Sequence, residues 1–121
     1  MANELSLTLK FRFERDDEIL EKEFIRQSFN VAGSNALMNY QTVGTAEEAL
    51  VLGDAGAGGY LLMWNTDATN YVEIRPATGI ADLVRLLAGD VALFRITNDA
   101  TAPFVIANTA SVRIGYILLP L

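Results

Sequence analysis

The chain has 121 residues, of which 51% are hydrophobic and 20% charged, and it contains no cysteine and no histidine. Its length suits one domain with a single core, residues 1–121, and its composition excludes intrinsic disorder. The missing residue types exclude disulfide scaffolds, thiolate zinc sites and the serine–histidine triad. A net charge of −6 without a basic cluster makes nucleic acids and anionic membranes poor partners. We expect no metal, no cofactor and no enzymatic activity.

Residues 5–13 alternate between apolar and polar side chains. Five apolar residues share one parity and four polar residues share the other: Leu5, Leu7, Leu9, Phe11 and Phe13, against Ser6, Thr8, Lys10 and Arg12. Successive strand side chains point to opposite faces, so the pattern predicts a half-buried antiparallel strand with its apolar face in the core. The acidic residues 16–18 predict a turn. A second strand is expected from about Glu23, with Ile25, Phe29 and Val31 facing inward.

Short apolar runs separated by turn-forming residues continue to the C-terminus. We expect strands at 36–43, 60–64, 71–74, 83–87, 91–96, 104–107 and 112–119. The runs 60–64 and 71–74 are interpreted as one hairpin, and 83–87 and 91–96 as another. Residues 45–50 could form a helical turn, since Thr45 and Glu48 have capping-box spacing, or residues 48–52 could open a strand. Residues 80–87 also allow a helix, but Gly89-Asp90 favours a strand before a tight turn.

Nine or ten short strands with a turn signal every 8 to 12 residues are typical of an antiparallel β-sandwich or barrel. On this fold, Trp64, Tyr60, Tyr71 and Phe94 are expected in the core or at its edge. Met38 and Tyr40 are expected on the apolar face of their strand. The arginines that alternate with apolar neighbours are expected on the outer faces of the sheets: Arg75, Arg85, Arg95 and Arg113.

Few residues suggest a chemical site, and each has a simpler structural interpretation. The glycine-rich segment 53–59 could cradle a phosphate, but no lysine and no helix follow it, which favours a loop. Residues 16–18 could bind calcium, although adjacent carboxylates rarely supply enough ligands. Four aspartates lie at expected turns, where this residue bonds its own backbone: Asp54, Asp67, Asp90 and Asp99.

The C-terminal segment is apolar on both parities, whereas a strand of a lone small domain should have one polar face. We therefore take its apolar residues as a candidate oligomer or capsid interface: Tyr116, Ile117, Leu118, Leu119 and Leu121. A mean hydropathy of +0.26, high for a small monomer, also favours burial against other chains, and a homotrimer is expected.

Several strings from Val43 to Leu118 are similar to those of a known class of proteins. They are 43–50 (VGTAEEAL), 52–54 (LGD), 59–61 (GYL), 65–74 (NTDATNYVEI), 87–95 (LAGDVALFR), 107–110 (ANTA) and 112–118 (VRIGYIL). In order and spacing they resemble small structural proteins encoded among the virion genes of tailed bacteriophages. The first third of the chain departs from this resemblance.

The resemblance implies a non-enzymatic virion protein with a jelly-roll-like all-β fold. The first expectation is a capsid decoration, or cement, protein that bridges coat subunits and stabilises the shell, with the major capsid protein or other virion proteins as partners. A tail, neck or fibre-base component is the alternative, and a carbohydrate-binding module or small hydrolase is an alternative of another class. No signal peptide begins the sequence and no apolar run is long enough to span a bilayer, so the expected location is the virion surface after synthesis in the host cytoplasm.

Overall fold

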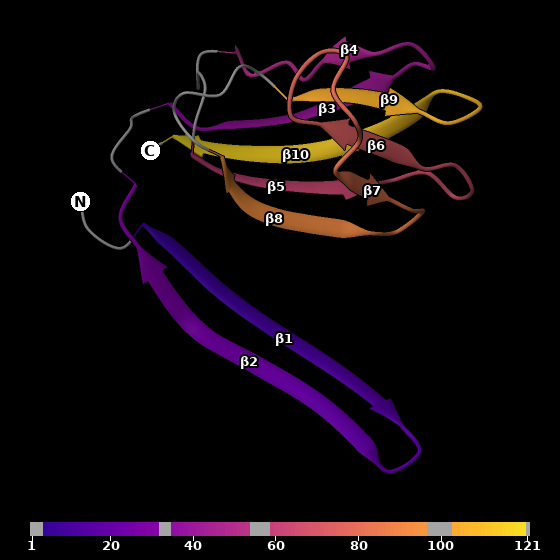
Figure 1. Cartoon of the computed structure of the whole chain (residues 1–121). Helices are drawn as coiled ribbons and strands as arrows, with labels where there is room; N and C mark the ends of the chain where they lie inside the picture. The colour runs from indigo at the N-terminus through magenta and orange to yellow at the C-terminus, as the bar shows by residue number, and fades with distance from the viewer. Residues whose placement is uncertain (1–3, 32–34, 54–58, 97–102, 121) are drawn as a thin grey trace. The chain divides into compact units, whose positions relative to one another are not determined.

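The structure, a computed structural model, describes residues 4–31, 35–53, 59–96 and 103–120 (Figure 1). The fold is all β and every strand pair is antiparallel, which confirms the predicted fold class. The described residues form ten strands: β1 (Leu5–Arg15), β2 (Glu18–Phe29), β3 (Leu37–Val43), β4 (Glu48–Ala49), β5 (Gly59–Asn65), β6 (Val72–Arg75), β7 (Val84–Leu86), β8 (Val91–Ile96), β9 (Phe104–Ala107) and β10 (Val112–Pro120).

The chain divides into two compact units, Met1–Ala32 and Gly33–Leu121. The first unit contains β1 and β2, which pair only with each other, and the second contains the remaining eight strands. The sandwich that the sequence predicts over residues 1–121 is therefore built from the strands of the second unit. The first unit is a two-stranded hairpin, which we call the arm.

The second unit has two four-stranded sheets with orders β3-β10-β5-β8 and β4-β9-β6-β7. Buried and half-buried residues alternate along β5, β6 and β9, while half-buried and exposed residues alternate along the edge strands β3 and β8. Buried side chains from both sheets form one hydrophobic core: Val43, Leu50, Leu61, Met63, Val72, Ile74, Leu86, Val105, Ala107, Val112, Ile114, Tyr116 and Leu118. The two sheets are thus the layers of a sandwich, with β10 and β5 central in one layer and β9 and β6 central in the other.

The two predicted hairpins are wrong, because each pair of consecutive strands lies in different sheets. β5 pairs with β10 and β8, whereas β6 pairs with β9 and β7. Asn65 stabilises the connection from β5 to β6, which crosses from one sheet to the other. Its buried amide nitrogen donates to the carbonyls of Asn70 and Leu86 at 3.0 Å each, and its Oδ1 accepts the Asp67 N–H at 2.7 Å. Apolar alternation identifies a strand but not its partner, which explains the error.

Residues 45–50 form no helix, and the alternative strand is confirmed as β4. The Glu48 carboxylate instead accepts the Gly44 N–H at 2.9 Å, so it ties the β3–β4 connection together without a helix. The preferred strand in residues 80–87 is confirmed as β7. The four arginines expected on the outer faces are not buried, and the strand neighbours of Arg85, Arg95 and Arg113 on both sides are the ones that pack inward, as expected.

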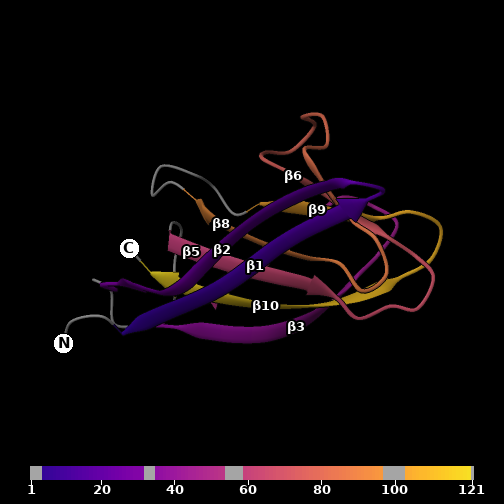
Figure 2. The ribbon, with the colours of Figure 1, turned by 90° about the horizontal axis from the view of Figure 1, so that it is seen from below.

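The arm has a β-bulge that decides which of its side chains share a face. β1 and β2 run side by side over their length (Figures 1 and 2). Leu7 is opposite Gln27 and Leu9 is opposite Phe24, so β2 has one extra residue between these pairs. Within this bulge Arg26 has a φ of 51°, and its N–H donates to the Thr8 hydroxyl at 3.2 Å. Such a bulge shifts the side-chain alternation of the strand by one position.

Candidate interaction surfaces

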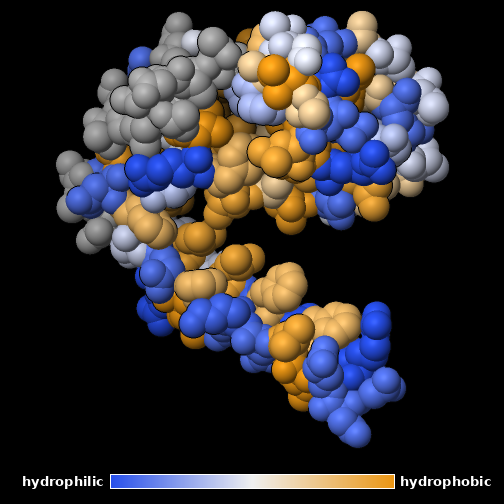
Figure 3. All heavy atoms as spheres, viewed as in Figure 1, coloured by the Kyte–Doolittle hydropathy of each residue, from blue (hydrophilic) through white to orange (hydrophobic). Residues whose placement is uncertain are grey.

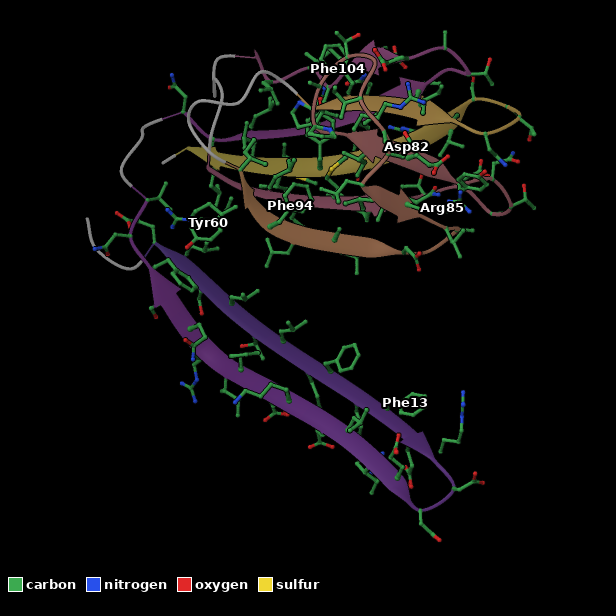
Figure 4. All side chains as sticks on the ribbon, viewed as in Figure 1. Phe13, Tyr60, Asp82, Arg85, Phe94 and Phe104 are labelled. Carbon is green, nitrogen blue, oxygen red and sulfur yellow. The ribbon has the colours of Figure 1, made fainter. Side chains whose placement is uncertain are left out.

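One face of the arm is mainly apolar. Directly opposed residues of an antiparallel pair lie on the same face, so the register defines it. We call it the arm face; its apolar residues are Leu5, Leu7, Leu9, Phe11 and Phe13 of β1 with Leu20, Phe24 and Phe29 of β2, and Gln27 and Lys22 lie on it opposite Leu7 and Phe11. The bulge is what brings Phe29 onto this face with Phe24. Figure 3 shows apolar side chains gathered along one side of the arm, and Figure 4 shows Phe13 projecting near its tip.

The opposite face of the arm is charged and joined by cross-strand ion pairs. Arg12 contacts Glu21 at 2.7 Å and Glu14 at 2.9 Å, and Lys10 lies 3.8 Å from Glu23. These exposed pairs contribute little to stability, about 0–1 kcal/mol each. Their main effect is to give the arm one water-facing side, so that it is an amphipathic ribbon.

Within its own unit the arm face has no core to pack against, because the first unit is a single two-stranded sheet, and this corrects the expectation for residues 5–13. None of the described residues 4–31 is buried, and Phe11 is 65% exposed. The second strand also differs from the prediction: it begins at Glu18, and Ile25 lies in the bulge with 58% exposure rather than facing inward. The alternation correctly indicated an amphipathic strand, but it carries no information on whether its apolar side is covered.

A second apolar surface covers the outer face of the β3-β10-β5-β8 sheet. We call it the sheet face, and its apolar residues alternate with the core residues of the same strands: Met38, Tyr40, Tyr60, Leu62, Trp64, Val91, Leu93, Gly115, Ile117 and Leu119. Four of them are well exposed, namely Met38 (61%), Tyr40 (41%), Val91 (64%) and Leu93 (39%). Met38 and Tyr40 therefore face outward, and the inward positions of β3 are Leu37, Asn39, Gln41 and Val43.

At the centre of the sheet face the indole of Trp64 lies against the backbone of Gly115. A Cβ at position 115 would lie 2.4 Å from Cε2 of the indole, closer than side chains approach one another. Tyr40, on the other side of Gly115, meets the indole edge to face at 5.9 Å between ring centroids. Glycine at 115 thus leaves room for the Trp64 indole over β10, so Trp64 belongs to this surface and not to the core, whereas Phe94 packs against the core as expected.

The sheet face carries positive charge in an acidic protein. Arg113 lies over the Tyr40 ring at 4.6 Å and Arg95 over the Tyr60 ring at 4.3 Å. Among the described residues neither arginine has an ion-pair partner, and no outward position of these four strands is acidic. The local charge of the sheet face is therefore +2.

The tip of the arm is acidic. Residues 14–18 contain four carboxylates and one arginine, a net charge of −3. Asp16 and Asp17 form the two-residue turn between Arg15 and Glu18, and Asp16 has a φ of 51°, a conformation that aspartate tolerates better than most residues. The described residues contain no cluster of acidic or other side chains arranged to hold a metal ion. The structure thus confirms the predicted turn at Asp16 and Asp17, whereas Glu18 is the first residue of β2.

The predicted interface residues of the C-terminus divide between the core and the sheet face. Tyr116 and Leu118 are fully buried, so they have no surface to offer a partner, and both are corrected to core residues. Ile117 and Leu119 are half-buried on the sheet face, and Leu121 lies outside the described residues. The segment is apolar on both parities because β10 is a central strand with the core on one side and an apolar outer face on the other.

The most polar cluster of the second unit is an ion-pair network on the other sheet. Arg75 bridges Glu47 at 2.6 Å and Asp82 at 2.5 Å. Hydrogen bonds from Thr78, Arg75 and the Gly79 N–H lower the pKa of Glu47 from 4.5 to about 2. The network fastens the β6–β7 connection to the residues before β4. Each carboxylate already has an arginine partner, so the cluster is best explained as structural.

The remaining candidates are turn residues or fall outside the description. Asp67 accepts the N–H groups of Asn70 at 2.6 Å and Thr69 at 3.0 Å, bonds that lower its pKa, and Asp90 accepts the Leu87 N–H at 2.9 Å. Both bond the backbone of their own connection, as predicted. Asp54, Asp99 and most of the glycine-rich segment 53–59 lie outside the described residues.

Comparison of the chain with protein-family models, with curated proteins and with solved structures finds no match. Within the described part of the chain there is no helix long and apolar enough to cross a membrane.

Proposed function

We propose that the chain is a non-enzymatic virion structural protein of a tailed bacteriophage, a capsid decoration protein that binds assembled coat subunits and stabilises the shell. The observation that carries this proposal is the arm face, which no described residue of its own unit covers. An isolated two-stranded hairpin is marginally stable in water, and apolar patches of this kind mark interaction sites. A chain with an arm face and a sheet face has two surfaces suited to assembly.

The strand pairing of the second unit supports the finer fold that the resemblance implies, a jelly roll. Counted from β3, the first strand pairs with the eighth, the second with the seventh, the third with the sixth and the fourth with the fifth. One long hairpin that is folded over into two sheets has this order of strand pairs, and so does a double Greek key. Jelly rolls form viral capsid and lectin domains as well as enzymes, so the topology alone does not choose a function.

A carbohydrate-binding module is the second candidate, because Trp64 and Tyr40 form an aromatic pair on the outer face of a sheet. Sugar recognition also needs hydrogen-bonding groups beside the aromatic rings. The outward positions of the four strands carry Thr42, Arg95 and Arg113 but no carboxylate or amide. The sheet face is therefore better suited to an apolar protein surface.

The test is co-sedimentation of the purified protein with two partners from the source phage: capsids that lack this protein, and free tails. Binding to capsids and not to tails is expected, and it should survive moderate salt because the contacts are largely apolar. Binding to tails alone would favour a tail, neck or fibre-base component. Retention on insoluble polysaccharide without binding to either particle would favour the carbohydrate-binding module.

A further inference from the structure

We propose that the arm face of one copy binds the sheet face of a second copy, so that the protein assembles head to tail into a closed ring. This inference rests on the proposed function, because it names the self-contact through which the decoration protein would form its oligomer.

The two surfaces match in size. The apolar stretch of the arm, residues 5–13, is about 27 Å long and two strands wide, roughly 10 Å, at about 3.4 Å per residue and 4.8 Å per strand. The sheet face runs about 20 Å along β10 from Arg113 to Leu119 and is four strands, roughly 15–20 Å, across. An arm laid obliquely over this sheet covers its aromatic centre.

The two surfaces also match in charge and in hydrophobic character. The sheet face has an apolar middle, with Arg113 and Arg95 at opposite ends of the register. The arm has a mainly apolar face, which includes Lys22 opposite Phe11, and it ends in a tip of net charge −3. When the arm face lies on the apolar middle of the sheet face, the acidic tip reaches the end of the sheet face that carries Arg113 or Arg95. Complementary charge at this end determines the orientation of the two copies more than their affinity. Two sheet faces would instead bring together two positively charged surfaces.

The stoichiometry favours a second copy as the occupant. Every chain carries one arm face and one sheet face, so each copy can give one contact and receive one. Such a heterologous contact closes a ring when the rotation between copies is right, and a ring leaves no unmatched surface. A trimer, the expected oligomer, would contain three identical arm contacts.

A mixing experiment separates this arrangement from other modes of self-association. Phe11→Asp places a charge on the arm face, and Leu93→Asp places one on the sheet face; both positions are exposed in the single chain. Each variant alone should sediment as a monomer of 13.2 kDa, whereas the wild-type protein forms the ring. An equimolar mixture should give a dimer of twice this mass, because one intact arm face and one intact sheet face remain. Lys10→Asp, on the charged side of the arm, is the control and should still form the ring.

Several results would overturn the inference. Leu93→Asp alone forming a dimer would show arm-to-arm contact, and Phe11→Asp alone forming a dimer would show sheet-to-sheet contact. A monomeric wild-type protein at high concentration, or a mixture of folded variants that stays monomeric, would exclude the contact between copies. Far-ultraviolet circular dichroism of each variant checks that it has folded.

Cysteine crosslinking provides a second measurement that does not weaken the contact. The wild-type chain contains no cysteine, so a disulfide between two singly substituted proteins must join two copies. Lys22→Cys lies on the arm face opposite Phe11, while Glu23→Cys lies next to it on the charged face. Lys22→Cys should crosslink to Met38→Cys or Val91→Cys, at the two sides of the sheet face, and Glu23→Cys should not. Crosslinking to neither position would overturn the inference.

Failure of this inference and failure of the proposed function are distinguishable, because self-association is measured on the purified chain alone. A wild-type protein that binds capsids without arm-dependent rings would refute only the head-to-tail contact. A protein that forms the ring but ignores capsids and tails would refute only the virion role.

Discussion

Gly115→Ala is the sharpest test of the sheet face. The new methyl group would lie 2.4, 2.5 and 2.7 Å from three atoms of the Trp64 indole, whereas carbon atoms pack at about 3.5–4.0 Å. The indole must therefore move by about 1 Å or swing off the sheet. Overpacking of this kind costs about 1–3 kcal/mol, and because Trp64 is half-buried on an outer face and can yield, we expect the lower half of that range. The displaced ring also loses its contact with Tyr40.

The assay is urea denaturation followed by tryptophan fluorescence, which reports on a single site because Trp64 is the only tryptophan. The variant should have a lower free energy of unfolding and a red-shifted native emission. Gly44→Ala is the matched control: nothing lies within 4 Å of its Cβ position, so its stability should change by less than about 1 kcal/mol and its emission should not change. Equal stability and equal emission in the two variants would refute the proposed packing of Trp64 on Gly115.

Three further predictions concern the core, the ion-pair network and the arm. Asn65→Ala leaves two carbonyls and one N–H without their partner, and should lower the free energy of unfolding by about 2–4 kcal/mol in urea titration; a change below 1 kcal/mol would contradict this. Because folding lowers the pKa of Glu47 from 4.5 to about 2, this carboxylate contributes fully to the free energy of unfolding above pH 4.5, and the contribution is lost as the pH falls towards 2. Glu47→Gln should therefore lose less stability than the wild-type protein between pH 4.5 and pH 2. Curves of unfolding free energy against pH that are parallel for the two proteins would contradict the assignment. Phe11→Ala in dilute, dissociated protein should lower the free energy of unfolding by less than about 1 kcal/mol, because the side chain is 65% exposed. A decrease of about 3–5 kcal/mol would mean that the arm face is covered within the single chain.

The sequence was sufficient to predict strands, because alternation is a local property. It identified the segment Leu5–Phe13, the strand near Val84 and the antiparallel all-β class. It did not predict which strands pair, because the partner of β5 is β10, more than forty residues away in the chain, and no pattern within either strand specifies the other. The extra residue at Arg26 had a visible signal, since Phe24 and Phe29 have opposite parity. Only a bulge brings both to one face.

The outward orientation of Met38 and Tyr40 was missed for a related reason. In β3 the inward positions include Asn39 and Gln41, whose polar groups bond the buried Tyr116 hydroxyl, while the outward positions are apolar. An interpretation based on hydrophobicity alone therefore assigns the inward and outward sides of β3 the wrong way round. The inversion is specific to a sheet whose outer face is also apolar.

This inversion bears directly on how the protein works. A sheet that places amides inward around Tyr116 and places methionine and aromatic rings outward does not follow the usual division between core and solvent. The inward amides are satisfied, since the Tyr116 hydroxyl accepts from Asn39 and Gln41 bonds the backbone of residues 49 and 51, so they cost the core little. No such compensation exists for the outward apolar side chains while they face water. The arm has the same exposed apolar surface on one side of a ribbon that has no core of its own. The contact that we propose between neighbouring copies would bury the arm face and the sheet face together.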